Sequence, residues 1–95
     1  MKTKGYSKHA LYRAKQRYCE TLEQAPDITE IRSKGYTKKH VGNTHNSLYK
    51  YFRKHERDNV QAYIYKRRLY IISVDTQRII TTYDIPKKYL QAYCL

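Results

Sequence analysis

The sequence predicts an α+β fold, in which two N-terminal helices precede a C-terminal antiparallel β-meander. Two observations support this prediction. Apolar residues recur at helical spacing between residues 7 and 31, and they alternate or run together in three short segments between residues 60 and 85. A chain of 95 residues can bury one modest core. We therefore expect a single domain over residues 1–95.

The first helix is expected over residues 7–22. Ser7 is a suitable N-cap because its hydroxyl can accept a hydrogen bond from the first turn. An apolar stripe follows at helical spacing: Ala10, Leu11, Ala14 and Tyr18. A basic row lies on the opposite side: His9, Arg13 and Arg17. The stripe is expected to pack across one face of the sheet.

The middle of the chain is predicted as a short helix, a loop and a further helix. The short helix begins at Asp27, which forms a pair resembling a capping box with Glu30, and ends at Gly35. Residues 36–46 are predicted as a loop that turns at Gly42. Residues 47–57 suit a helix capped by Asn46 or Ser47, but they also alternate as in a strand, and we favour the helix.

Three strands are expected over residues 60–65, 69–74 and 78–85. The middle strand is apolar on both faces, which is typical of a central strand. Turns are expected at residues 66–68 and 75–77, and Pro86 ends the third strand. The tail after Pro86 is either a helical turn or a loose end.

Charge is the strongest functional signal in the chain. It has 20 Lys and Arg against 8 Asp and Glu, a formal net charge of +12, and 12 tyrosines beside one phenylalanine and no tryptophan. A field of this strength attracts polyanions, and tyrosine rings can stack on bases. The composition therefore predicts a nucleic-acid partner, with RNA ahead of DNA.

A binding surface is expected in the basic middle of the chain. Tyrosines and cations alternate there, as base-stacking and phosphate contacts require. The residues that we expect to bind nucleic acid are Lys38, Lys39, Tyr49, Lys50, Tyr51, Arg53 and Lys54. Tyr63 and Tyr65 share one strand face and are expected to pack against a helix instead.

Several other classes of protein are disfavoured. No apolar run is long enough to span a bilayer, and the basic N-terminus lacks the apolar core of a signal peptide, so we expect a cytoplasmic protein with no membrane partner. Cys19 and Cys94 are expected to be free thiols. We expect no cofactor and no metal, because no zinc-finger spacing and no glycine-rich phosphate loop occurs.

Both ends of the chain resemble one family. The segment SKHALYRAKQR at residues 7–17 and the closing RLYIISVDTQRIITTYDI are similar to the opening helix and the strand–turn–strand ending of small RelE/BrnT-like proteins. Residues 36–59 have no counterpart in that pattern. The superfamily includes metal-free ribonucleases of the barnase, EndoU, colicin and RelE kind. The resemblance implies a RelE-like fold and an endoribonuclease of toxin type.

The resemblance also implies a catalytic set. Metal-free RNA cleavage needs a base for the 2′-hydroxyl, an acid for the 5′ oxygen and cations for the phosphate. His9 would transfer the proton, Arg13 and Arg17 would clamp the phosphate, and Tyr83 would orient or protonate. An alternative metal-dependent reading, in which His40, His45 and His55 form an HNH-like site, lacks the expected preceding strand.

Two functions remain open from the sequence. The first is a toxin-type endoribonuclease, which an acidic antitoxin would hold. The second is a non-catalytic phage or mobile-element protein that binds nucleic acid or inhibits a host nucleic-acid enzyme. The net charge would attract an acidic antitoxin and an acidic host factor equally. Growth arrest on expression without a partner would favour the first function.

Overall fold

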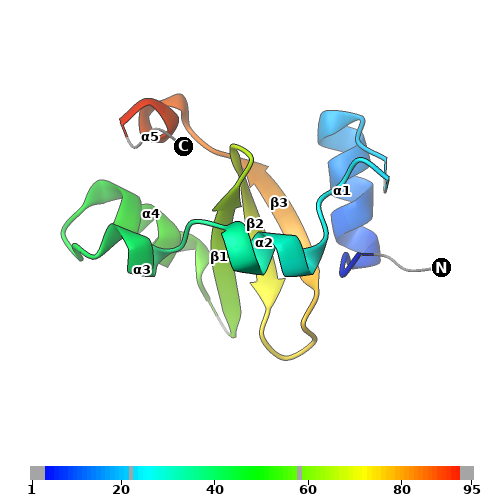
Figure 1. Cartoon of the computed structure of the whole chain (residues 1–95), viewed down its shortest axis with the longest axis horizontal. Helices are drawn as coiled ribbons and strands as arrows, with labels where there is room; N and C mark the ends of the chain where they lie inside the picture. Colours follow the sequence, from blue (N-terminus) through cyan, green and yellow to red (C-terminus); the bar gives the residue numbers. More distant parts are fainter. Residues whose placement is uncertain (1–3, 22, 58, 93–95) are drawn as a thin grey trace.

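A computed structural model describes residues 4–21, 23–57 and 59–92 (Figure 1). The structure is α+β with a three-stranded antiparallel sheet, as the sequence predicted. In chain order the elements are α1 (Lys8–Tyr18), α2 (Ile28–Lys34), α3 (Lys38–Val41), α4 (Ser47–His55), β1 (Val60–Tyr65), β2 (Arg68–Ser73), β3 (Ile79–Asp84) and α5 (Lys87–Ala92). Within the described residues four helices precede the sheet, where the sequence predicted two N-terminal helices and favoured a third over residues 47–57.

Helix α1 begins where the sequence predicted and ends earlier. The Ser7 hydroxyl accepts a hydrogen bond of 3.1 Å from the Ala10 N–H and so caps the first turn. Cys19 adopts a left-handed conformation at φ 50°, and its N–H bonds back to the last turn. The helix therefore stops at Tyr18, and the predicted end at Leu22 lies outside the described residues.

Helix α2 is capped by Asp27, whose side chain accepts a hydrogen bond of 2.8 Å from the Thr29 N–H. Glu30 reaches the sheet and accepts a hydrogen bond from the Tyr65 hydroxyl. Gly35 is the C-cap, but its φ of −68° suits any residue. Glycine is needed there because a Cβ would collide with the Ile31 carbonyl oxygen.

The predicted loop over residues 36–46 was wrong at Lys38–Val41, which forms α3. The His40 Nδ1 accepts a hydrogen bond of 3.0 Å from the Thr37 N–H, in the way that Glu or Gln does in the usual capping box.

The next helix, α4, was predicted correctly. Asn46 caps α4 by accepting a hydrogen bond of 2.8 Å from the Leu48 N–H, so the strand alternative for this segment was wrong.

The three strands form the predicted meander in the order β1-β2-β3. A two-residue loop joins β1 to β2, and both of its residues, Lys66 and Arg67, have positive φ. This conformation matches the right-handed twist of a hairpin. The pairing of β2 with β3 shifts between Ile71 and Ile72, and Ile80 is the extra residue on β3.

Helices cover both faces of the sheet (Figure 1). Leu69 and Ile71 of β2 pack with buried residues of α4 and α5, whereas Tyr70 and Ile72 pack with buried residues of α1 and α2. This confirms that β2 is buried on both faces. The buried residues of α1 are Ala10 and Ala14; Ala10 packs in the core that α1 and α2 form with the sheet, and Leu11 packs against it half-buried.

Both edges of the sheet are paired with other backbone segments. Tyr36 exchanges two hydrogen bonds with Ile64 at the β1 edge, of 2.7 and 2.8 Å. At the β3 edge, the Ile79 N–H bonds to the Gly5 carbonyl oxygen at 2.7 Å, and the Ser7 N–H bonds to the Ile79 carbonyl oxygen at 2.8 Å. The second contact fixes the start of α1 beside the start of β3, so α1 runs alongside that strand (Figure 1).

The structure bears on two further expectations, which concern membrane-spanning segments and the two cysteines. Within the described residues, no helix has the length and apolar character to cross a membrane. Cys19 is an exposed free thiol, and Cys94 lies outside the described residues.

Candidate nucleic-acid site

The register of the sheet places Tyr83 on the face that α4 covers. Tyr83 on β3 pairs with Leu69 on β2, and partners in an antiparallel pair point to the same side. Leu69 belongs to the core formed with α4 and α5, and Tyr83 packs half-buried against that core. The Tyr83 ring is therefore held on a strand instead of a loop.

Helix α4 brings His55 to the Tyr83 ring, with 5.1 Å between ring centres. Tyr51 lies one turn earlier on the helix, and its ring meets His55 edge-on at 4.8 Å. Tyr89 of α5 closes the row, 5.0 Å from Tyr51. Four rings from α4, β3 and α5 thus form one contiguous aromatic row.

Arg17 reaches the same row from the other side of the β3 edge. Its Nη1 donates a hydrogen bond of 2.6 Å to the Thr82 carbonyl oxygen, and its guanidinium lies 5.3 Å from the centre of the Tyr83 ring. Arg17 is exposed. Its remaining N–H groups are therefore accessible to a ligand at Tyr83.

An open pocket of about 280 Å³ lies beside these rings. Its lining residues are Lys54, His55, Arg57 and Tyr83. Two of the four, Lys54 and Arg57, are basic, and no Asp or Glu is among the lining residues that the structure describes. A polar pocket with this lining fits an anion, and a phosphate is the common biological anion that cations of this kind bind.

The electrostatics keep the histidine uncharged near neutral pH. Burial lowers the pKa of His55, and the charges of Lys54 and Arg57 lower it further. Burial also raises the pKa of Tyr51 to about 12, together with the neighbouring tyrosines and Asp84. The site therefore holds a neutral imidazole, which can accept a proton, beside a tyrosine that keeps its proton.

The predicted catalytic residues divide into two groups. Arg17 and Tyr83 come together as described above. His9 and Arg13 lie nearer the start of α1, where the Arg13 Nε contacts the His9 Nε2 at 3.5 Å. A helix rises about 1.5 Å per residue, so His9 lies about 12 Å along the axis from Arg17.

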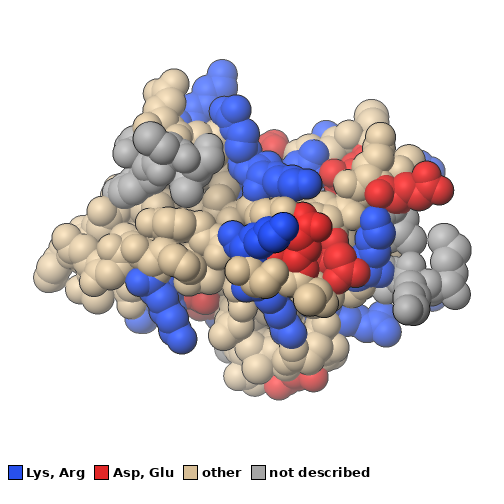
Figure 2. All heavy atoms as spheres, viewed as in Figure 1, with Lys and Arg blue, Asp and Glu red and all other residues tan. Residues whose placement is uncertain are grey.

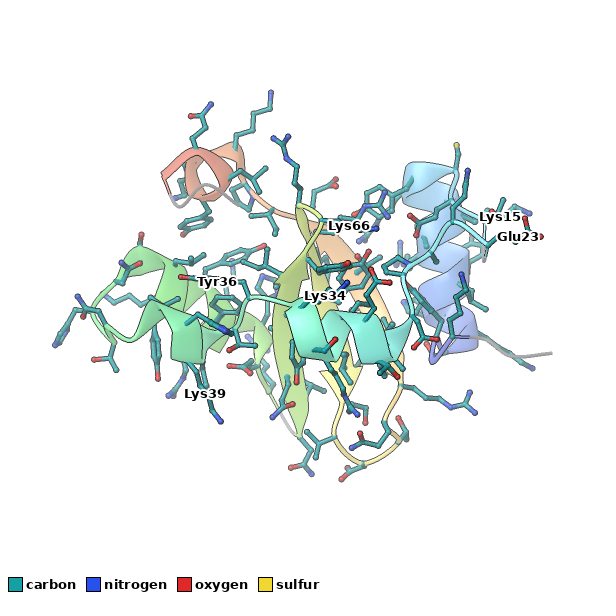
Figure 3. All side chains as sticks on the ribbon, in the orientation of Figure 1. Lys15, Glu23, Lys34, Tyr36, Lys39 and Lys66 are labelled. Atoms are coloured by element: carbon teal, nitrogen blue, oxygen red, sulfur yellow. The ribbon has the colours of Figure 1, made fainter. Side chains whose placement is uncertain are left out.

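The predicted nucleic-acid-binding residues are spread over two helices. Lys38 forms an ion pair of 3.1 Å with Glu56, and Lys39 is exposed on α3 (Figure 3). On α4, Lys54 lines the pocket and Tyr51 lies in the aromatic row. The remaining three lie elsewhere on α4, where Lys50 and Arg53 are exposed and Tyr49 is half-buried. Tyr63 and Tyr65 pack against the α1 and α2 core, as expected.

The site includes residues that the sequence did not single out for this chemistry. His55 was considered only within an HNH-like set, and Arg57 was not considered. The helical spacing of Tyr51 and His55 was a usable signal, because residues four apart share a helix face. Among the residues that the structure describes, no three His, Cys, Asp or Glu side chains are placed to hold a metal ion.

Several acidic side chains lie around α2. Figure 2 shows them near α2, beside Lys and Arg side chains. Two ion pairs lie in this region, Arg68–Glu20 at 2.7 Å and Lys66–Glu30 at 3.8 Å. These cations are therefore partly neutralised by protein carboxylates, whereas Lys54 and Arg57 form no ion pair among the described residues.

Comparisons with known proteins add no assignment. No family model, curated protein or solved structure matches the chain.

Proposed function

We propose that this chain is an RNA-binding protein, and that the pocket between α4 and β3 holds a phosphate of the RNA. The pocket itself carries this proposal, because two cations, Lys54 and Arg57, line it and none of its described lining residues has a carboxylate. Arg17 adds a third cation at Tyr83. Single-stranded RNA is favoured over duplex DNA because the half-buried rings of Tyr51, His55 and Tyr83 lie next to the cations, and unstacked bases can contact aromatic rings.

Metal-independent RNA cleavage is the second candidate function, and the neutral His55 beside Tyr83 favours it. In this reaction the 2′ oxygen attacks the adjacent phosphorus and forms a P–O bond, while the bond to the 5′ oxygen breaks. His55 would accept the 2′-hydroxyl proton, and the Tyr83 hydroxyl or water would supply a proton to the departing oxygen. Arg17, Lys54 and Arg57 would stabilise the added negative charge.

The α+β fold with a three-stranded antiparallel sheet agrees with the fold class that the RelE-like resemblance implies. We propose that α1 and the three-stranded meander correspond to the opening helix and the closing strands of that family. The segment with no counterpart in the pattern, residues 36–59, contains α3 and α4. On this proposal, the chain's own insertion supplies His55, and an acidic antitoxin or an acidic host factor remains the proposed protein partner.

An RNA cleavage assay in EDTA tests the catalytic proposal. We expect products that end in a 2′,3′-cyclic phosphate or a 3′-phosphate, and an RNA with a 2′-deoxy residue at the cut site should resist. At saturating RNA, His55→Ala should abolish cleavage, and His9→Ala should leave most of it. The assay is run with and without ribosomes.

The variants separate the possible outcomes. Loss of cleavage in His9→Ala, with cleavage retained in His55→Ala, would show that His9 transfers the proton instead of His55. RNA binding without cleavage by the unmutated protein in either condition would leave the non-catalytic binding protein. No RNA binding at low salt would contradict the proposed function as a whole.

A further inference from the structure

One basic surface extends from the site described above along α1. Helix α1 carries no Asp or Glu, and none of its cations takes part in an ion pair among the described residues. Three of its side chains are spaced four residues apart: His9, Arg13 and Arg17. We call these three the basic flank of α1.

The basic flank is anchored to the site at one end. Arg17 is fixed at the β3 edge by its bond to the Thr82 carbonyl oxygen and lies over Tyr83. Each step of four residues advances about 6 Å along the axis and about 40° around it. Arg13 and His9 therefore continue from Arg17 away from Tyr83, back toward the start of β3.

The middle of the flank is held by contacts within the helix. The Arg13 Nε lies 3.5 Å from the His9 Nε2, and the Arg13 Nη1 lies 3.4 Å from the Gln16 Oε1. Neither partner is a carboxylate, so the Arg13 charge is oriented without being neutralised. A guanidinium held in this state is suited to bind an anion.

The opposite side of α1 provides a natural comparison. Lys15 is exposed, and it lies about 200° around the helix from Arg13. Figure 3 shows Lys15 at the α1 end of the molecule. Arg13 and Lys15 thus contribute equal charge to the same helix, but only Arg13 lies in the row that leads to Tyr83.

We infer that the basic flank of α1 is an extended contact surface for single-stranded RNA, along which the strand continues from the pocket past Arg17 to Arg13 and His9. This inference rests on the proposed function, because the pocket defines where the strand begins. An acidic polypeptide is the other class of polyanion that fits a basic helix. RNA is favoured because the flank is continuous with a pocket suited to phosphate.

The test compares Arg13→Gln with Lys15→Gln. The probe is a 2′-O-methyl RNA of about 12 nucleotides, which resists attack by its own 2′ oxygen, and affinity is measured by fluorescence anisotropy over a range of salt. Each phosphate contact on a single strand contributes about 0.7 to the slope of log affinity against log salt. We expect Arg13→Gln to lose several-fold in affinity and about 0.7 in slope, and Lys15→Gln to lose clearly less of both.

A shorter probe of about three nucleotides and a Lys54→Gln/Arg57→Gln variant separate the inference from the proposed function. The short probe should bind Arg13→Gln and the unmutated protein equally, because it fills only the pocket. Equal losses of long-probe affinity in Arg13→Gln and Lys15→Gln would overturn the inference about the basic flank. The proposed pocket would still stand if the double variant lost binding of both probes. Unchanged binding by the double variant would contradict the proposed function itself.

A polyglutamate probe examines the other class of partner. Weaker polyglutamate binding by Arg13→Gln, with unchanged binding of the long RNA, would overturn the inference and assign the flank to an acidic polypeptide.

Discussion

The Arg17 guanidinium lies 5.3 Å from the centre of the Tyr83 ring, although α1 and α4 cover opposite faces of the sheet. The contact is possible because β3 is an edge strand, so Arg17 passes around it and bonds to the Thr82 carbonyl oxygen. Tyr83 is thereby enclosed between a cation from one layer and His55 from the other.

This relationship predicts that Arg17 cannot be replaced by lysine. Lysine keeps the charge but lacks the planar group that lies over the ring and bonds to a carbonyl at the same time. We expect Arg17→Gln to weaken RNA binding several-fold and Arg17→Lys to restore only part of the loss, as measured by anisotropy. Arg78→Gln, an exposed arginine in the β2–β3 turn, is the control. Full recovery with lysine would show that only the charge matters.

The lowered pKa of His55 predicts a loss of stability on the acid side. An unfolded histidine titrates near pH 6.5, so between that value and the lower pKa in the folded state the unfolded chain binds more protons. Stability should fall as pH drops through this interval. Urea unfolding at several pH values between about 7.5 and 5 should show a weaker fall for His55→Gln. An identical fall in both proteins would contradict the assignment.

The core predicts unequal costs for two apolar truncations. Ile72 is fully buried in the central strand, so Ile72→Ala should cost about 3–4 kcal/mol in the free energy of unfolding. Leu11 is half-buried, so Leu11→Ala removes less buried apolar surface and should cost about 1–2 kcal/mol. Urea denaturation measures both. A larger cost at Leu11 would place α1 deeper in the core than the structure does.

The ion pair between Glu20 and Arg68 predicts a stability contribution outside the site. The two groups are 2.7 Å apart, and the Arg68 guanidinium stacks 3.8 Å from the centre of the Tyr18 ring. Glu20→Gln should cost about 1–3 kcal/mol, because it leaves a partly buried guanidinium without its counter-charge. Glu23→Gln, which removes an exposed carboxylate, should cost much less. Unfolding by urea checks the difference, and equal costs would exclude a specific role for the pair.

Much of the fold was predictable because local signals agreed with it. Ser7, Asp27 and Asn46 cap the helices that the sequence assigned to them, and the apolar run in β2 identified the central strand. The missed helix α3 had a histidine where a capping box normally has Glu or Gln. The early end of α1 depends on a left-handed cysteine, a conformation that residue type does not indicate.

The site was only partly predictable because its residues meet through tertiary packing. Tyr83 and Arg17 were each predicted from the family resemblance, yet their contact depends on β3 being at the edge of the sheet. His55 reaches Tyr83 because α4 packs on the opposite face from α1. Sequence spacing along one helix, as in His9, Arg13 and Arg17, cannot show which end of the row meets another element.

Locating the bound RNA by NMR tests the central claim most directly. Unmutated protein labelled with ¹⁵N and ¹³C is titrated at low salt with a single-stranded 2′-O-methyl RNA, and the backbone amides, aromatic rings and arginine Nε groups are followed. We expect the largest shifts at the pocket residues His55, Arg57 and Tyr83 and at Arg17. Shifts centred on the acidic region near α2, or no shift at any residue, would contradict the account.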